Sequence, residues 1–477
     1  MSAKLLTSSQ KENIKNYKYS VVDNSLTSKY LKKHWEYFQG FFPDYVAPNV
    51  ISLTGLIITL YGWDICNTYY VDRPYVSCLL TVLCLFTYLN LDAIDGIHAR
   101  KTKNSSPVGE IIDHGCDSVS AFFIGLIVFK FLYIINLNIL WYLTIPVSMG
   151  FSYAHLMTLV NPNLQFGKYT GPSEIILYVC ALMTLKTFGI GSVYLQYFST
   201  CLSQYSTNIF CCVFCVTLYH VNFIIRKKYP YTANGVSLVY IVLMLKGYLL
   251  DEPTLLSVIA DNMIIATMTC DIIISKMAKK NLSQWIIVIA LVSQLSNIIG
   301  IIISLFFVTF QIYEIADYMN IPILSTNINI YCSGVFDLCH AGHIKMFENS
   351  LQFGNKLYVG VHNDEAVKSY KREPIKNHEE RCRDVRNAKF VTEVIPNADL
   401  FVTREDIEKY NIHIVVCSEE YFDEKDDLKG YYKVPRDMGI LRVLPYSKEI
   451  STSDLIKRIA SRNTLENKQK NDNVSFV

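Results

Sequence analysis

Long apolar segments recur over the first two thirds of the chain, and they constrain its fold more than any other feature. They lie at about 48–70, 75–94, 118–137, 139–160, 174–192, 206–225, 233–250 and 254–275. Each is close to the length that crosses a hydrocarbon core of roughly 30 Å as a helix. A ninth run, Trp285 to Ala316, is about 32 residues long and has polar residues near its middle. We predict a hairpin of two spans there, which gives about ten transmembrane helices in all.

The chain changes character after about residue 326. Charged and amide residues become frequent, and strand-like segments alternate with helix-like ones. This alternation is typical of a doubly wound, Rossmann-like parallel sheet. The sequence therefore predicts a multi-domain protein, with a polytopic all-α membrane domain followed by a soluble α/β domain. The predicted boundaries are a membrane domain at 1–325 with an interfacial helix at about 28–42, a soluble domain at 326–462, and a disordered tail at 463–477.

Basic residues cluster in alternate connections between the apolar segments, at 100–103, 168, 226–228 and 276–280. The positive-inside rule assigns such connections to the cytosol. We therefore expect an integral, multi-pass membrane protein whose N-terminus, basic connections and C-terminal domain all face the cytosol.

Charge and cysteine content argue against a nucleic-acid-binding protein and against a disulfide-rich protein. The formal net charge is +2, and no basic and aromatic pattern suggests nucleic acid as a partner. The 14 cysteines are scattered and several lie in apolar segments, so we expect free thiols and no disulfide framework.

Four aspartates stand between the second and third apolar segments: Asp92, Asp95, Asp113 and Asp117. Offsets of three and four residues place each pair on one face of a helix. Carboxylates that converge beside a membrane require a cation, and oxygen ligands suit Mg²⁺ or Mn²⁺. The alternative is that the four aspartates are solvated acidic side chains near helix ends.

The same stretch completes the pattern D-x-x-D-G-x-x-A-R-x8-G-x-x-x-D-x-x-x-D, so the chain resembles the CDP-alcohol phosphotransferases. Over roughly 15–320 it resembles the eukaryotic choline/ethanolamine phosphotransferases. The resemblance implies an endoplasmic-reticulum-type membrane, two Mg²⁺ held by the four aspartates, and CDP-ethanolamine or CDP-choline and diacylglycerol as substrates. It also implies a nucleotide site shaped by Gly96, Ala99, Arg100 and Gly109.

The general base of such a transfer has more than one candidate. A generic assignment is Asp117, but a carboxylate bound to a cation is a weak base. His114 has a better intrinsic pKa, and Glu174 stands where the choline/ethanolamine phosphotransferases carry a glutamate. We predict His114 assisted by Glu174, although a glutamate at a helix start also complements the helix dipole.

A second constellation follows the first strand of the soluble domain. It contains Gly334, Phe336, Asp337, His340 and His343, and it leads into a helix. A strand, a glycine turn and a helix N-terminus form an anion site in this topology, and two histidines can direct donors at one phosphate. The alternative is that the histidines merely cap the helix.

The histidines and the segments after them resemble the phosphoethanolamine and phosphocholine cytidylyltransferases over about 328–460. The resemblance implies a nucleotidyltransferase that uses CTP, with His340 and His343 stabilising charge on the α-phosphoryl group and Lys371 holding phosphates. Further nucleotide-binding candidates are Arg381, Ser451, Thr452 and Ser453. The chain departs from the family at Tyr446, where an arginine is expected, and at Glu449, where a glycine is expected, and Lys448 is a candidate substitute for the arginine.

Together the two halves predict a bifunctional phospholipid-synthesis enzyme. One domain makes a CDP-alcohol, and the other transfers its phospho-alcohol to diacylglycerol. The segment 359–364 resembles ethanolamine-type more than choline-type cytidylyltransferases, so ethanolamine is favoured. The alternatives are a phosphotransferase for another head group, or a C-terminal domain that senses nucleotide without catalysis. The oligomeric state stays open, with a homodimer among the possibilities.

Overall fold

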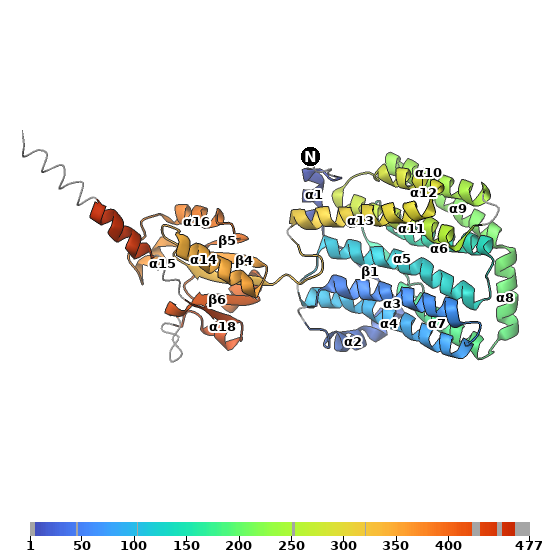
Figure 1. Ribbon diagram of the computed structural model, residues 1–477, viewed down its shortest axis with the longest axis horizontal. Coiled ribbons are helices and arrows are strands. Elements are labelled where there is room, and N and C mark those ends of the chain that lie inside the picture. Colours follow the sequence, from blue (N-terminus) through green and yellow to red (C-terminus); the bar gives the residue numbers. More distant parts are fainter. Residues whose placement is uncertain are drawn as a thin grey trace, which may run out of the picture. The chain divides into compact units, whose positions relative to one another are not determined.

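The structure is a computed structural model that describes residues 5–43, 46–102, 104–249, 253–319, 321–421, 430–445 and 451–462 (Figure 1). The chain divides into two compact units, Met1–Thr326 and Asn327–Val477. The first unit is built of helices and the second contains a parallel sheet, which confirms the predicted fold class. The predicted disordered tail at 463–477 lies outside the described residues.

The helices of the first unit frequently begin with proline, whose missing N–H costs nothing at the first helical position. Pro48, Pro74, Pro107 and Pro172 each open a helix in this way. The elements of the unit are α1 (Ser8–Lys15), β1 (Val21–Asp23), α2 (Leu26–Gln39), α3 (Pro48–Tyr69), α4 (Pro74–Lys101), α5 (Pro107–Phe131), α6 (Leu137–Met157), β2 (Leu164–Phe166), α7 (Pro172–Thr187), α8 (Ser192–Gln204), α9 (Ser206–Phe223), α10 (Pro230–Leu249), α11 (Leu255–Ala278), α12 (Trp285–Leu295) and α13 (Asn297–Met319).

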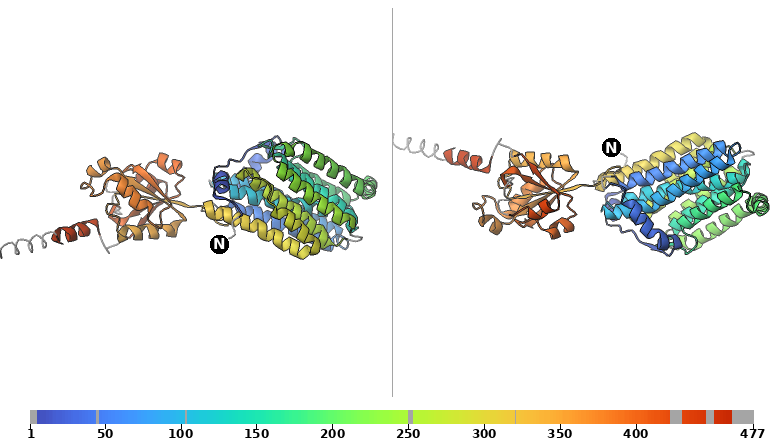
Figure 2. Two further views of the ribbon diagram at one scale, coloured as in Figure 1. Left: turned by 90° about the horizontal axis from the view of Figure 1, so that it is seen from above. Right: turned by 90° about the horizontal axis from the view of Figure 1, so that it is seen from below.

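Six of the described helices are long and apolar enough to cross a membrane, or seven if α7 and α8 count as one bent span. This is fewer than the ten spans predicted. One cause is the end of α7 at Thr187, after which Gly189 and Gly191 adopt φ of 72° and 66°. These left-handed conformations, which glycine adopts readily, turn α8 by 119° from α7. As a result α8 runs across the ends of the bundle helices in Figure 1 and is seen end-on in Figure 2.

Another cause lies in the run from Trp285 to Ala316, and α6 and α10, which match the predicted spans 139–160 and 233–250, are also not among the six. The chain breaks at Ser296 between α12 and α13, close to the predicted polar break, and the two helices pack on each other. A Cβ on Gly300 would lie 2.6 Å from the Cβ of Ser293, so α12 and α13 approach each other closely at this glycine. However, α12 has only 11 residues and spans about 16 Å, too short to cross a bilayer alone.

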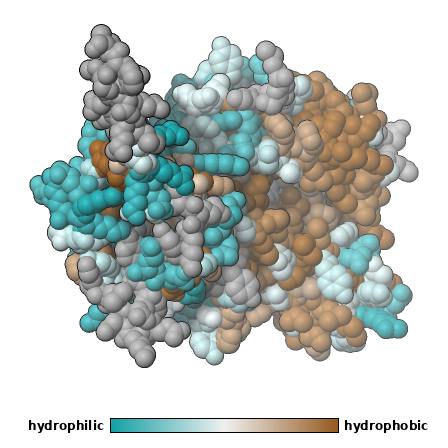
Figure 3. Space-filling model, turned by 60° about the vertical axis from the view of Figure 1, so that its left-hand side comes forward, coloured by the Kyte–Doolittle hydropathy of each residue, from teal (hydrophilic) through white to brown (hydrophobic). Residues whose placement is uncertain are grey.

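The core of the first unit is organised around α11, which packs against α5, α6 and α13. In the apolar 18-residue stretch of α11, 89% is buried inside the unit. The outer helices instead expose apolar side chains such as Ile57, Leu79 and Phe306, as helices in contact with lipid do. In Figure 3 the surface of this unit is largely hydrophobic and drawn in brown, whereas the second unit has a largely hydrophilic surface drawn in teal.

Helix α2 has the amphipathic character predicted for an interfacial helix at 28–42. Trp35 is buried and donates its indole N–H to the Oδ1 of Asn90 at 3.2 Å. Tyr30 and Tyr37 are exposed on the same helix. Aromatic and basic side chains exposed on one helix suit a membrane interface, and that location of α2 stays a prediction.

The second unit contains a five-stranded parallel sheet of order β5-β4-β3-β6-β7. Alternate residues of β3 face opposite sides, with Ile330 packing toward α14 and α16 and Tyr331 toward α17 and α18. The order reverses between β3 and β6, which creates a crevice at their carboxyl ends. The elements are β3 (Asn329–Gly334), α14 (Ala341–Ser350), β4 (Lys356–His362), α15 (Asp364–Lys368), α16 (His378–Arg386), β5 (Glu393–Ala398), α17 (Arg404–Lys409), β6 (Ile414–Ser418), α18 (Lys433–Asp437), β7 (Leu441–Leu444) and a helix at 452–462.

Candidate functional site

The four aspartates lie on two adjacent helices, α4 and α5. Carboxylate oxygens of Asp92, Asp113 and Asp117 come within 4.8 Å of one another, which makes a group able to hold a metal ion. The phenol of Tyr88 donates to Oδ1 of Asp117 at 2.9 Å and orients that carboxylate. Three carboxylates form the hard oxygen donor set that Mg²⁺ or Mn²⁺ prefers, so these residues fit the predicted cation.

Asp95 is not a member of this three-residue group. Its carboxylate accepts a hydrogen bond from the hydroxyl of Ser52 on α3, and the residue is buried. It nevertheless lines the cavity beside the cluster, as does Asp113. The structure therefore brings three of the four predicted ligands together and places Asp95 next to them.

The cavity beside the cluster has a volume of about 340 Å³. All of the residues predicted to shape a nucleotide site line it: Gly96, Ala99, Arg100 and Gly109. The local fold explains the position of Gly109, because Ser106 caps α5 and its Oγ accepts the N–H of Gly109 at 3.1 Å. Residues 17–19, far away in the sequence, form another part of the wall.

His114 also lines this cavity, and it has a partner that the sequence analysis missed. Its Nδ1 lies 3.3 Å from Nε2 of His155 on α6, so the two buried imidazoles form a hydrogen bond. Nε2 of His114 lies 3.9 Å from Oδ2 of Asp113. An ionisable side chain inside the apolar run 139–160 was the signal that could have identified His155.

Glu174 opens α7 but does not line the cavity. Its Oε1 accepts hydrogen bonds from the backbone N–H and the hydroxyl of Thr27, both at 2.8 Å. Its other oxygen, Oε2, is buried and has no hydrogen-bond partner among the described residues. Glu174 thus joins α7 to the first turn of α2, and its assistance to His114 stays a prediction.

The second unit has a cavity of about 410 Å³ at the carboxyl ends of β3, β6 and β7, where the strand order reverses. The predicted residues of both its histidine motif and its phosphate-binding set line this cavity: Gly334, Phe336, Asp337, His340, His343, Lys371, Ser451, Thr452 and Ser453. Ser418, Glu420 and Tyr432 line it as well. Tyr432 belongs to no recognisable sequence motif, so the sequence could not indicate that it lines the cavity.

The two histidines stand at the start of α14. His340 is the N-cap residue, and its backbone N–H donates to Nδ1 of His343 at 3.4 Å, which leaves the proton of a neutral His343 on Nε2. Nε2 of His340 lies 3.2 Å from the hydroxyl of Thr452. Burial, followed by the charges of His340 and Lys371, lowers the pKa of His343 to about 3. The pair is therefore neutral at physiological pH and acts through hydrogen bonds.

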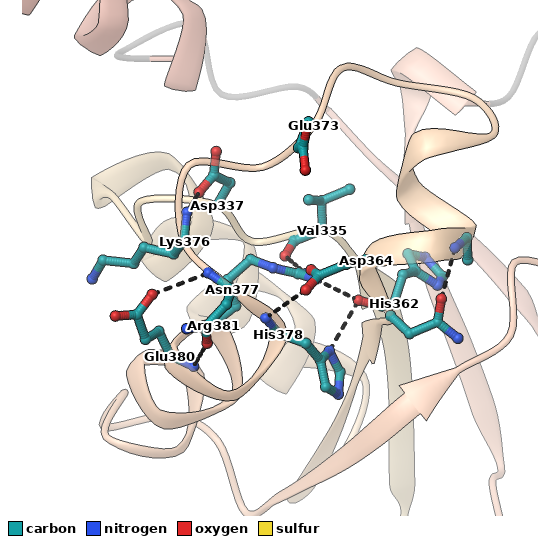
Figure 4. Close-up of polar contacts among 12 residues, drawn as sticks. Val335, Asp337, His362, Asp364, Glu373, Lys376, Asn377, His378, Glu380 and Arg381 are labelled. Carbon is teal, nitrogen blue, oxygen red and sulfur yellow. Dashed lines mark hydrogen bonds and ion pairs between the residues drawn. The ribbon is translucent and has the colours of Figure 1, made fainter.

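Arg381 differs from the prediction, because it lies outside this cavity. The side chain is fully buried, and Figure 4 shows it pointing between the ends of two strands. Its guanidinium donates to the carbonyl oxygen of Val335 at 2.6 Å, to that of His362 at 2.8 Å, and to Oδ1 of Asp364 at 2.6 Å. Arg381 thus ties the ends of β3 and β4 to the segment that leads to Lys371, and its part in nucleotide binding stays a prediction. The departures at Tyr446, Lys448 and Glu449 lie outside the described residues.

Comparison with known proteins finds a family match in each unit. Residues 45–203 match the CDP-alcohol phosphatidyltransferase family, and residues 331–458 match the cytidylyltransferase-like family. The chain is 34% identical to cholinephosphotransferase 1 of Rattus norvegicus over 189 residues, 39% of this chain and 47% of that protein. It is 33% identical to choline/ethanolaminephosphotransferase 1 of Saccharomyces cerevisiae over 197 residues, 36% of this chain and 46% of that protein.

The chain therefore spans a little under half of the length of these relatives. Among solved structures, it is similar to the lipopolysaccharide core biosynthesis protein from Thermoplasma volcanium GSS1, with 23% identity over 26% of this chain and 98% of that chain and a TM-score of 0.22. The two family matches cover the two candidate sites separately, and the chain joins a CDP-alcohol phosphotransferase domain to a cytidylyltransferase-like domain.

Proposed function

We propose that this chain catalyses two consecutive steps of phospholipid synthesis. The soluble domain, 326–462, makes CDP-ethanolamine from CTP and phosphoethanolamine. The membrane domain, 1–325, transfers phosphoethanolamine from that product to diacylglycerol and releases CMP. The observation that carries this proposal is a carboxylate cluster beside a cavity in one unit and a histidine-lined cavity in the other, each within a matching family region.

In the membrane domain, Asp92, Asp113 and Asp117 would hold the divalent cation, with Asp95 beside them. When bound, the ion would neutralise the diphosphate of the CDP-alcohol. The acceptor hydroxyl forms a bond to the phosphorus that carries the amino alcohol, and the bond from that phosphorus to CMP breaks. His114 takes the proton of the hydroxyl, while its bond to His155 holds the imidazole in one orientation.

In the soluble domain, an oxygen of phosphoethanolamine attacks the α-phosphorus of CTP, and pyrophosphate leaves. His340 and His343 donate hydrogen bonds to the oxygens on which charge develops, and Lys371 holds the phosphates. This is catalysis by orientation and electrostatics, and it needs no covalent intermediate on the protein.

Product analysis with separate variants tests the two steps. The purified full chain is given CTP, phosphoethanolamine and diacylglycerol, and the lipids and nucleotides are resolved by mass. Asp113→Asn should abolish lipid formation from supplied CDP-ethanolamine while CDP-ethanolamine synthesis continues, and His343→Ala should do the converse, so each variant is the control for the other. Loss of both activities in either folded variant would contradict two independent sites.

The choice of head group is part of the proposal. A trimethylammonium group favours an aromatic cage, whereas a primary ammonium needs oxygen acceptors. Glu420 lines the soluble-domain cavity and offers such an acceptor. We expect a higher kcat/KM for phosphoethanolamine than for phosphocholine in the cytidylyl transfer. The reverse order would assign choline, and nucleotide binding without pyrophosphate release would favour a sensor domain.

A further inference from the structure

The stretch Tyr17-Lys18-Tyr19, here named the strap, crosses one wall of the membrane-domain cavity between two anchored segments. On one side, α1 is fixed to α13 because Nζ of Lys11 lies 2.8 Å from Oε1 of Glu314. On the other side, β1 pairs in parallel with β2, with Val21 opposite Leu164. The strap is therefore held at both ends by residues that do not touch the cavity.

Tyr17 fixes the middle of the strap against the bundle. Its phenol donates to Oε1 of Glu110 on α5 at 3.1 Å. Nζ of Lys276 on α11 lies 5.4 Å from the centre of its ring, within the range of a cation–π contact. Glu110 follows Gly109 and lines the same cavity. These contacts join the strap to the helix that carries Asp113.

Tyr19 lies in a different environment from Tyr17. Although it lines the cavity, 47% of its surface is exposed. Its ring meets the imidazole of His114 edge-on, with centroids 5.9 Å apart and an interplanar angle of 77°. A ring that contacts His114 and leaves about half of its surface exposed beside the cavity is a platform on which a flat group can stack.

The other residues of the cavity wall indicate which kind of ligand carries that flat group. Arg100 and Lys18 supply positive charge, and Asn49 and Ser106 supply amide and hydroxyl groups. Phosphates, a ribose and a base would each find a partner in such a lining.

We propose that the strap forms the nucleoside subsite of the membrane domain: the ring of Tyr19 stacks on the cytosine of the CDP-alcohol, Lys18 faces its phosphates, and Tyr17 is a positioning residue. This inference rests on the proposed phosphotransfer for its substrate. It assigns recognition of the base to a segment that precedes the matched family region, 45–203.

Steady-state kinetics of the full chain in lipid nanodiscs test the stacking. Tyr19→Ala should raise the KM for CDP-ethanolamine about tenfold, since stacking of a base on an aromatic ring is worth about 1–3 kcal/mol. The KM for diacylglycerol should stay unchanged. Tyr19→Phe should remain within about twofold of the wild type, and Tyr30→Ala, an exposed tyrosine of α2 outside the cavity, should have no effect. An unchanged KM for CDP-ethanolamine in Tyr19→Ala, or an equal rise in both KM values, would overturn the inference.

Chemical labelling gives a readout that does not depend on transfer. Acetylation of Lys18 is followed by mass spectrometry with and without CDP and Mg²⁺, and Lys29, on α2 and outside the cavity, is the internal control. CDP should slow the labelling of Lys18 in the wild type and in Tyr19→Phe, but much less in Tyr19→Ala. Protection without any lipid product would refute the proposed reaction and leave the subsite standing. Equal labelling of Lys18 with and without CDP would refute the subsite.

Discussion

The imidazoles of His340 and His343 are stacked, with ring centroids 3.9 Å apart and 19° between their planes. Two charged imidazoles could not remain at this distance in a buried site, and burial is the main reason that the pKa of His343 falls to about 3. The imidazole N–H donors of this site are consequently available without any permanent charge.

The low pKa of His343 predicts that the soluble domain loses stability in acid. Between pH 6.5, its ordinary pKa, and about pH 3, the unfolded chain binds a proton that the folded chain does not. The free energy of unfolding therefore decreases as the pH falls, by up to about 2 kcal/mol between pH 7 and 5 from this residue. Urea unfolding of the intact chain, followed by pulse proteolysis, should show a smaller decrease in His343→Gln. Equal decreases in the two proteins would contradict the prediction.

Arg381 should be essential for the stability of the soluble domain. Arg381→Lys cannot reach Val335, His362 and Asp364 together, so at least one of these acceptors loses its bond to the buried side chain, and the substitution should cost about 1–3 kcal/mol. Arg383→Lys, on the same helix, is the matched control. Its side chain is 68% exposed and pairs with the exposed Glu379, so a change below about 0.5 kcal/mol is expected. The same urea assay compares the two variants, and similar losses would argue against a special role for Arg381.

Gly300 should be required for the close packing of α12 on α13. In Gly300→Ala, the new Cβ would lie 2.9 Å from the Cα of Ser293, so one helix must move. We expect a loss of about 1–3 kcal/mol, measured as a lower thermal midpoint of the detergent-solubilised protein. Gly150→Ala is the control, because a Cβ there meets no atom within 4 Å and alanine favours a helix. An unchanged midpoint in Gly300→Ala would show that the hairpin accommodates the methyl group.

The proposed orientation predicts which connections face the cytosol. In a cysteine-free background, Lys168→Cys should react with an impermeant thiol reagent added to sealed vesicles of cytosolic-side-out orientation. Ile135→Cys, in the connection between α5 and α6, should react only after the membrane is permeabilised. The opposite pattern would invert the topology and place the aspartate cluster on the other side.

Local patterns in the sequence predicted the residues of both sites, because their motifs lie on single helices or directly after a strand. Asp113 and Asp117 share a helix face by spacing alone, and His340 and His343 share the first turn of α14. Contacts between distant segments left no such pattern. The bond from Tyr17 to Glu110 and that from His114 to His155 depend on packing. The complete burial of Arg381 likewise cannot be seen in its motif. Apolar length likewise predicted spans but could not reveal the turn of α8 at Gly189 and Gly191.

The contacts between α1 and α13 also indicate at which end of the helical unit another domain can be fused. Glu314, near the end of α13, accepts the backbone N–H of Leu5 at 3.0 Å and pairs with Lys11, so the helical unit closes the end of its last helix with its own N-terminal segment. A gene fusion after Met319 then extends a helix whose last turns, at Ile315 and Ala316, already pack in one cluster with Leu6 and Ile14. Exchange of the soluble domain for another module is therefore a mild change to the bundle, whereas a large module fused directly before Leu5 would compete with the packing of α1.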